Sequence, residues 1–578
     1  MGQANMIRCI LRDDPVQINI HAVWPVPDGA SVDAVADALG VLVARHEALR
    51  TTFPGAATTF PDEQVVAPEG EFTFTVRDHH GFTGDPGRHA ETVARDARVE
   101  RFRLDRDFPL RITLLSYDGV PRHLALAASH AATDGGALNV LYEEWRTLLG
   151  GGELPAPAAL APVDLALEER SPAGQRKSAA ALRYWERVIR TGPQAMFAEP
   201  GVRPGDTATP QLTLRSLRAG RALAAAASRT GSPAQTVLLT AWCTLIGHRA
   251  GQRSCVAAAP TANRQRPNLA RAVTTLSQDA LLQLDLGGPT FDTVLRKAWG
   301  AALDAYRHSR FDSVQLWDMI GRTTHERGSQ FARDVVFNDV SSVLATRTDT
   351  GGPGAAHPDL ELSWGPEQEL PSRALTFVYA SEPALHLALW ADPRLFDRQA
   401  AEGFLTGLVR LLEAVAVADV PLDALTGVTG VPAARRDERW RRVDGCWISP
   451  QAVTEALRTA LGHFAPVKEG SEGNEGSGGP QVHVAVETPR VHVSVDAPSG
   501  PDAGADPELT AFIAAGDDSA LTPTRAHAAL MEVLPGRPEL LAPHRYVIVP
   551  APPSHPGDTA AWRRLPVLTE GSGRERPM

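Results

Sequence analysis

A histidine, an aspartate and two glycines stand close together in the stretch His130–Gly136, which reads His-Ala-Ala-Thr-Asp-Gly-Gly. Residues 123–129 before it alternate like a strand, and residues 137–145 after it have apolar positions at helical spacing. The histidine should therefore lie at the end of a strand and the glycines at the start of a helix. An imidazole and free backbone N–H groups in one turn are a combination that acyl-transfer chemistry can use. By itself, the same pattern also fits a packed core histidine.

Strands and helices on both sides of this stretch must position it. Residues 16–24 alternate as a strand should, and Pro25 ends that run. Ser31 then caps a segment of helical spacing that leads to Arg45–Phe53, which reads Arg-His-Glu-Ala-Leu-Arg-Thr-Thr-Phe. A Gly/Pro/Ala-rich linker follows the helix after the histidine, and the composition of the chain changes again after Val431. The sequence therefore predicts a mixed α/β protein with two α/β halves, residues 1–160 and 161–430, and a small α+β domain, residues 431–578.

The composition restricts the classes of partner. The chain has 578 residues, of which 57 are Lys or Arg and 68 are Asp or Glu, so its formal net charge is -11. This charge does not favour a nucleic acid or an anionic membrane as a partner. The four cysteines show neither a Cys-x-x-Cys pair nor histidines at ligand spacing, so we expect no metal site and no disulfide framework. No apolar stretch is long enough to span a bilayer, and we expect a cytoplasmic protein.

Several motifs along residues 2–417 resemble, in order, those of the condensation-domain superfamily of nonribosomal peptide synthetases. Arg45–Phe53 is similar to its Arg-His-Glu-x-Leu-Arg-Thr-x-Phe motif, and His130–Gly135 is similar to its active-site motif His-x-x-x-Asp-Gly. Ala262–Arg264 resembles the entry into its latch region. The resemblance implies a V-shaped fold of two chloramphenicol-acetyltransferase-like lobes. It also favours a chemical role for His130 over that of a packed core histidine.

In this family an acyl or aminoacyl thioester on a phosphopantetheine arm reacts with an amine or a hydroxyl. The resemblance implies that His130 takes or positions the proton of that nucleophile, a contribution of ~10²–10⁴-fold in rate, and the Gly135 N–H is a candidate donor to the oxyanion. It pairs Asp134 with Arg50, which would hold the turn. The family usually has two adjacent histidines here, and Ser129 stands in the first place. We therefore expect His130 and Gly135 to be catalytic, and Asp134, Arg50 and Ser129 to support them.

Other catalytic units are missing from the sequence. It contains no Gly-x-Ser-x-Gly elbow, no Gly-Gly-x-Ser carrier site and no adenylation core signature. Acyl or peptidyl carrier proteins should therefore act in trans and supply the phosphopantetheine, and we expect this chain to bind no cofactor of its own. Residues 443–453, 508–513 and 551–558 resemble the small C-terminal subdomain of adenylate-forming enzymes. The lysine of that subdomain is absent, since Asp558 follows Gly557, so we expect a docking or scaffold role.

Three hypotheses follow for the function. The leading one is a free-standing condensation enzyme of natural-product biosynthesis that forms an amide or an ester, with a small-molecule or a carrier-bound nucleophile. The second is a catalytically inactive adaptor that binds carrier or synthetase proteins, which Ser129 and the lysine-free tail suggest. The third is acyl transfer from coenzyme A to a small acceptor. The sequence leaves donor, acceptor and product open because the shape of the space between the lobes decides them.

Overall fold

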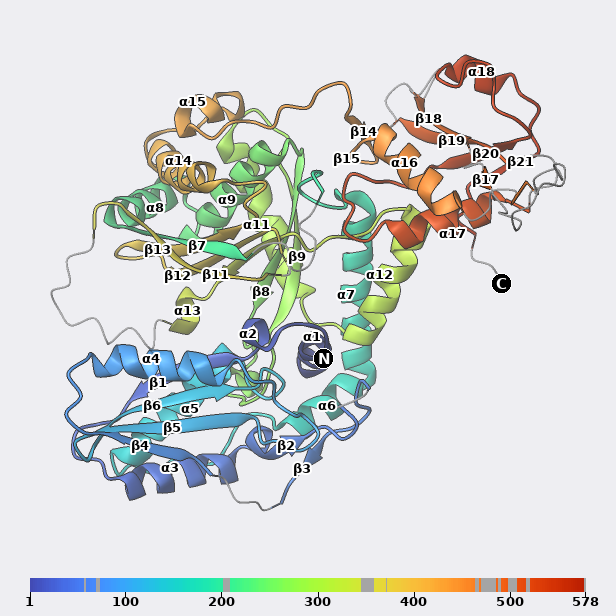
Figure 1. Ribbon diagram of the computed structural model, residues 1–578. Coiled ribbons are helices and arrows are strands. Elements are labelled where there is room, and N and C mark those ends of the chain that lie inside the picture. The colour runs from blue at the N-terminus through green and yellow to red at the C-terminus, as the bar shows by residue number, and fades with distance from the viewer. Residues whose placement is uncertain are drawn as a thin grey trace, which may run out of the picture.

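The computed structural model shows two α/β lobes and a smaller domain at the C-terminal end of the chain (Figure 1). This confirms the predicted α/β class. Within the described part of the chain, no helix combines the length and apolar character needed to cross a membrane. The residues that the structure describes are 1–56, 59–68, 73–200, 208–344, 358–370, 372–462, 467–468, 485–486, 490–496, 507–515 and 520–575.

The N-terminal lobe is built on a four-stranded sheet whose strands, in spatial order, are β1 (Ile20–Pro25), β6 (Val120–Ala128), β5 (Leu110–Tyr117) and β4 (Thr75–His79). Helices α3 (Val32–Arg45) and α5 (Gly135–Leu149) cover one face, and α4 (Pro86–Ala97) covers the other (Figure 1). The short elements of this lobe are α1 (Gly2–Arg12), α2 (Pro15–Ile18), η1 (Glu47–Arg50), β2 (Thr51–Thr52) and β3 (Val65–Val66).

Local sequence explains how this lobe begins. Ser31 accepts a hydrogen bond from the Ala34 N–H and caps α3, as predicted. The strand predicted from residue 16 starts at Ile20 instead, because Asp14 caps and Pro15 begins the short helix α2. Strand β6 lies in the interior of the sheet and pairs antiparallel with β1 and β5. The residues at its C-terminal end are buried, so the turn that follows β6 has a fixed position.

The C-terminal lobe contains a seven-stranded sheet whose strands, in spatial order, are β11 (Glu361–Gln368), β7 (Thr209–Ser216), β13 (Leu385–Ala391), β12 (Ala374–Ala380), β10 (Val335–Asp339), β8 (Ser254–Thr261) and β9 (Gln278–Asp285). Four helices pack on one face: α8 (Leu217–Thr230), α9 (Ala234–Ala250), α11 (Phe291–Arg307) and α14 (Arg398–Val417). Helix α9 is buried on nearly every side, which makes it the centre of this core. The short elements are α10 (Pro267–Ala270), α13 (Ser341–Leu344), η3 (Leu422–Ala424) and α15 (Leu425–Thr429).

Three helices connect the lobes and the C-terminal domain. Helix α6 (Pro162–Arg170) follows the N-terminal lobe, and α7 (Pro172–Thr191) runs from there toward the C-terminal domain beside α12 (Ser313–Arg327) (Figure 1). The side chain of Ser178 on α7 accepts the Asp312 N–H at 2.8 Å, which fixes the start of α12. The two helices therefore form one rigid pair that reaches from the junction of the lobes to the C-terminal domain.

The C-terminal domain has a hairpin, β14 (Arg441–Val443) and β15 (Cys446–Ile448), and a sheet of β18 (Arg490–Asp496), β19 (Glu508–Ala514), β20 (Arg545–Val549) and β21 (Thr569–Gly571). Helices α16 (Pro450–Leu461) and α17 (Pro523–Val533) pack on one face, and α18 (Thr559–Arg563) supplies Trp562 to the other. A separate two-stranded pair is β16 (Val467–Lys468) with β17 (Ala485–Val486). This is the α+β architecture predicted for the end of the chain.

A polar interface fixes this domain to the second lobe. Gln194 donates from Nε2 to the carbonyl oxygens of Pro538 and Leu540, at 2.6 and 2.7 Å. Arg327, at the end of α12, donates from Nη2 to the Asp444 carbonyl oxygen at 2.9 Å. Because Gln194 and Arg327 are buried, these bonds are shielded from water.

Candidate active site

The stretch that carries His130 is a tight turn between β6 and α5. Ser129 closes this turn: its Oγ accepts the Ala131 N–H at 3.3 Å, and its carbonyl oxygen accepts the N–H groups of Ala132 and Thr133 at 3.1 and 3.2 Å. Ser129 is fully buried. A small residue that stabilises the turn therefore stands where the condensation-domain motif usually has the first of two histidines. His130 is the residue that the turn presents.

The imidazole of His130 has the properties of a base. Burial lowers its pKa below the usual value of 6.5, and the negative charge of Asp134 opposes this only in part. The ring is therefore neutral at pH 7. Its Nδ1 atom is buried and has no hydrogen-bond partner among the residues that the structure describes. The backbone of His130 is held separately, since its carbonyl oxygen accepts a hydrogen bond from the Thr275 hydroxyl.

Asp134 joins the two lobes at this turn. Its Oδ1 atom accepts the Ala137 N–H at 2.8 Å, which caps α5, and also accepts from Nη2 of Arg264 at 2.5 Å. Its Oδ2 atom accepts the backbone N–H groups of Leu276 and Ser277, at 3.0 and 3.3 Å. The arginine and both amides belong to the second lobe. One buried carboxylate thus fixes the active-site helix against the opposite lobe.

The predicted pair of Asp134 and Arg50 is wrong. Arg50 lies at the end of η1, and its Nη1 donates to the Ala67 carbonyl oxygen. Arg264 and the two amides of the second lobe already occupy both oxygens of Asp134. Arg264 is itself held in place, because its guanidinium donates to the carbonyl oxygens of Ala272 and Thr274 at 2.6 and 3.1 Å. The charge that neutralises Asp134 therefore comes from the second lobe.

Gly135 and Gly136 are the first two residues of α5. Their N–H groups have no partner inside the helix, because no turn of helix precedes them. A Cβ on Gly136 would lie 2.3 Å from Nε of Arg264, so a glycine is needed for the guanidinium to reach Asp134. A Cβ on Gly135 would lie 3.1 Å from Cγ1 of Val343 on α13. The role predicted for the Gly135 N–H as a donor to an oxyanion stays a prediction, which this position at the start of a helix allows.

The segment Arg45–Phe53 supports the site through α5. Nε of Arg45 and Nε2 of His46 lie 3.2 and 2.7 Å from Oε2 of Glu144, in the middle of that helix. Burial by itself would raise the pKa of Glu144, but the hydrogen bond from His46 and the charges of Arg45 and Arg271 lower it. The first two residues of the motif therefore fix the helix that follows the turn with His130.

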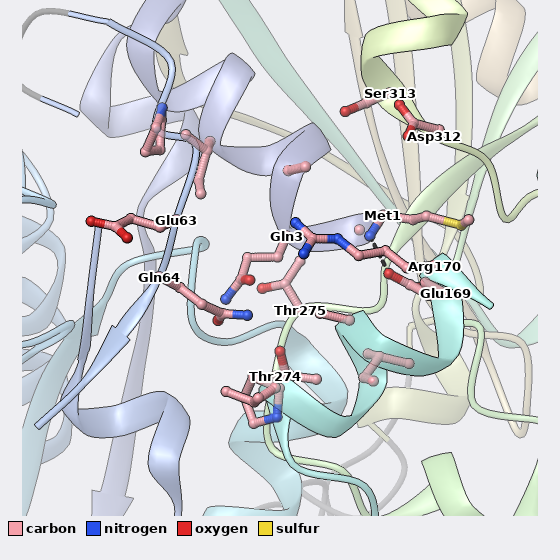
Figure 2. A pocket seen from close by; sticks show the side chains of 18 of the residues that line it. Met1, Gln3, Glu63, Gln64, Glu169, Arg170, Thr274, Thr275, Asp312 and Ser313 are labelled. Carbon is pink, nitrogen blue, oxygen red and sulfur yellow. Dashed lines mark hydrogen bonds and ion pairs between the residues drawn. The ribbon is translucent and has the colours of Figure 1, made fainter. Parts of the chain in front are cut away.

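A cavity of about 470 Å³ lies between α1, α6 and the start of α12 (Figure 2). Thr275, which binds the His130 carbonyl oxygen, is part of its lining. On its apolar side, Ile7 and Phe53 belong to the same packed cluster as Ala131. Thr275, Ile7 and Phe53 thus separate this cavity from the turn that carries His130, and no residue of that turn is part of its lining.

A histidine-bearing turn at the junction of two α/β lobes is the arrangement expected of a fold with two chloramphenicol-acetyltransferase-like lobes. A comparison with protein-family models gives the particular family. Residues 10–430 match the model described as "Condensation domain". The chain belongs to the condensation-domain family. The matched region ends at the start of the C-terminal domain.

Curated proteins similar to this chain are multidomain peptide synthetases. The chondramide synthase cmdD of Chondromyces crocatus is 28% identical over 319 residues, which cover 52% of this chain and 8% of that protein. The phosphinothricin tripeptide synthetase PhsC of Streptomyces viridochromogenes is 29% identical over 264 residues, which cover 43% of this chain and 24% of that protein. The chain thus spans less than a quarter of the length of these two relatives.

Solved structures confirm the predicted two-lobed fold. SgcC5 of Streptomyces globisporus is 20% identical with a TM-score of 0.53, and the match covers 70% of this chain and 94% of that protein. The condensation domain of the monacolin K polyketide synthase MokA is 16% identical with a TM-score of 0.56, and the match covers 73% of this chain and 98% of that domain. At these identities the likeness extends to the fold alone.

The sequence predicted the residues of the candidate site that lie on the first lobe. The structure brings Ser129, His130, Asp134 and Gly135 together in one turn and places Arg50 elsewhere. The half that lies on the second lobe was missed, namely the pairing of Arg264 with Asp134 and the hydrogen bond from Thr275. Arg264 did stand in a motif similar to the family's latch entry, which was the one available signal.

Proposed function

We propose that this chain catalyses the condensation of an acyl or aminoacyl thioester, carried on the phosphopantetheine arm of a separate carrier protein, with an amine or a hydroxyl. The observation that carries this proposal is the half-buried, neutral imidazole of His130 in the turn that leads into the first two amides of α5. Membership of the condensation-domain family supports the thioester as donor. The thiol arm belongs to the partner, and this chain supplies the binding surfaces and the base.

The residues suggest the following course of reaction. The nucleophile attacks the thioester carbonyl carbon while His130 takes its proton. The oxyanion that forms accepts a hydrogen bond from the Gly135 N–H, which is worth roughly 3–4 kcal/mol when the donor is aligned. The intermediate then collapses, the carbon–sulfur bond breaks, and the proton on His130 passes to the leaving thiolate. Each turnover yields one amide or ester and one free thiol, and the imidazole returns to its neutral form.

The proposal is tested with a carrier protein loaded with an acyl-phosphopantetheine and with hydroxylamine as a small, unselective nucleophile. Wild-type protein should release acyl hydroxamate, and His130→Ala should lower the rate by about 10²–10⁴-fold. Arg146→Gln, at an exposed position near the C-terminal end of the same helix, is the matched control and should retain most of the activity. Equal hydroxamate from wild type and His130→Ala would remove His130 from the mechanism. Carrier binding without any turnover would instead favour an adaptor.

A further inference from the structure

A short segment of the second lobe, residues 275–277, contacts the turn that carries His130. The backbone N–H groups of Leu276 and Ser277 donate to Oδ2 of Asp134, at 3.0 and 3.3 Å. The hydroxyl of Thr275 donates instead to the carbonyl oxygen of His130. Two contacts of this segment therefore end on the aspartate that caps α5, and one ends on the histidine itself.

The surroundings of Thr275 hold its hydroxyl in a fixed place. The residue is buried, so its hydrogen bond to His130 is shielded from water. The branched Cβ of a threonine also restricts its χ1 angle. The backbone is held on one side by the bond from Leu276 to Asp134 and on the other by α1, since a Cβ on Gly2 would lie 2.7 Å from the Thr275 carbonyl oxygen. The packing of both lobes therefore sets the position of the hydroxyl.

The bond from Thr275 bears on the direction of the imidazole. Nδ1 of the ring is buried and has no hydrogen-bond partner among the residues that the structure describes, so no bond at this atom fixes the ring. The ring projects from the main chain of His130, and Thr275 fixes the carbonyl end of that main chain. A base must lie within hydrogen-bond reach of the proton that it takes, and a displacement of about 1 Å can cost about 100-fold in rate. A contact on the main chain of His130 can therefore control proton transfer.

We propose that Thr275 is a positioning residue of the condensation reaction. Its hydroxyl holds the main chain of His130 and thereby directs the imidazole at the nucleophile. Thr275 acts through His130 and takes no proton itself. Because Thr275 belongs to the second lobe and His130 to the first, the base is in place only while the two lobes are docked. This inference rests on the proposed function, since it concerns the base of that reaction.

The experiment uses the hydroxamate reaction of the full-length protein with an acyl-loaded carrier. Thr275→Val keeps the shape of the side chain but loses the hydroxyl, so kcat should fall about 10- to 100-fold while KM for the acyl carrier changes by less than about twofold. Thr275→Ser keeps a hydroxyl donor and should restore most of kcat. Thr240→Val is the matched control and should leave kcat unchanged, because it removes a buried hydroxyl that donates to the Thr236 carbonyl oxygen, at 2.6 Å, within α9.

A double variant and a spectrum separate this inference from the proposed function. Thr275→Val should slow the His130→Ala protein by less than about twofold further, because Thr275 acts through the imidazole. In ¹⁵N-histidine-labelled protein, the His130 ring signals, assigned by their loss in His130→Ala, should shift in Thr275→Val and stay in place in Thr275→Ser. Wild-type kcat in Thr275→Val, no rescue by Thr275→Ser, unmoved ring signals, or an equal loss in the His130→Ala background would overturn the inference. Full activity of His130→Ala would reject the proposed base, and the ring signals would still decide whether Thr275 positions His130.

Discussion

His130 shows at the residue scale how a fold sets the charge of one group. Its imidazole belongs to the turn between β6 and α5, where burial removes water from the charged form of the ring. Asp134 lies in the same turn and would favour the charged form, but Arg264 neutralises that carboxylate. The balance lowers the pKa of His130, so the ring is available as a free base at neutral pH, as the proposed reaction requires.

A pH profile tests this balance. Because the neutral ring is active and its pKa lies below 6.5, kcat/KM should stay level as the pH falls through 6.5 and should decline only in more acidic buffer. The measurement is the rate of hydroxamate release at limiting acyl carrier over a range of pH. Arg264→Met should move the acid limb to higher pH, because an unneutralised Asp134 favours the imidazolium. An acid limb centred above pH 6.5 in the wild type would contradict this reading.

The corrected partner of Asp134 gives a second prediction at this scale. Arg264→Met leaves a buried carboxylate without its cation and should lower the free energy of unfolding by about 3–5 kcal/mol. Arg50→Met removes one hydrogen bond to a carbonyl oxygen and should cost only about 1 kcal/mol. Urea unfolding of both variants, followed by tryptophan fluorescence, compares the two arginines directly. A larger loss for Arg50→Met would restore the pairing that the sequence suggested.

At the scale of elements, helix α5 is the element whose attachments hold the candidate site in position. Asp134 caps its first turn, Gly136 admits the arginine of the other lobe, and Glu144 is bound by Arg45 and His46. The helix is thus fixed at its start and in its middle by two different segments. An N-terminus that is fixed in this way can direct amides at a reacting carbonyl without reorganising.

Glu144→Gln tests the second of these attachments. Because the pKa of Glu144 is lowered below 4.5 in the folded protein, its ionised form stabilises the fold above that pH, and the effect is lost as the pH falls through the lowered pKa. The variant should lose about 1–3 kcal/mol of unfolding free energy at pH 7. The loss should shrink in acid below pH 4.5. Glu143→Gln, on the adjacent, more exposed position, serves as control and should change stability by less than about 1 kcal/mol.

At the scale of the whole molecule, α7 and α12 connect two regions that the sequence places far apart. Residues near the start of both helices line the cavity, and the last residue of α12 and Gln194, which follows α7, contact the C-terminal domain. Gln194 and Arg327 make the contacts there through buried hydrogen bonds. These buried hydrogen bonds attach the C-terminal domain to the second lobe, and the docking or scaffold role expected from its sequence stays a prediction.

Gln194→Leu should loosen this attachment. The change leaves the carbonyl oxygens of Pro538 and Leu540 buried without a donor, so we expect a loss of about 2–4 kcal/mol. Trypsin should then cut the arginine-rich segment 435–442 faster than in the wild type. Gln330→Leu, whose side chain accepts a hydrogen bond from Gly536 at the exposed edge of the interface, is the matched control and should cost less than about 1 kcal/mol. Equal cleavage in all three proteins would argue against a fixed domain.

The sequence by itself determined the local features of this protein. Alternation before His130 and helical spacing after Gly136 involve residues a few positions apart, so strand, turn and helix could be predicted directly. Only the tertiary structure decided what Asp134 binds, because Arg264 stands 130 positions away in the chain and no local pattern reports its place in space. The same holds for the cavity, where Gln3, Gln64 and Arg170 come from three separate segments. Contacts between such segments depend on how the lobes pack, and packing is a property of the whole chain.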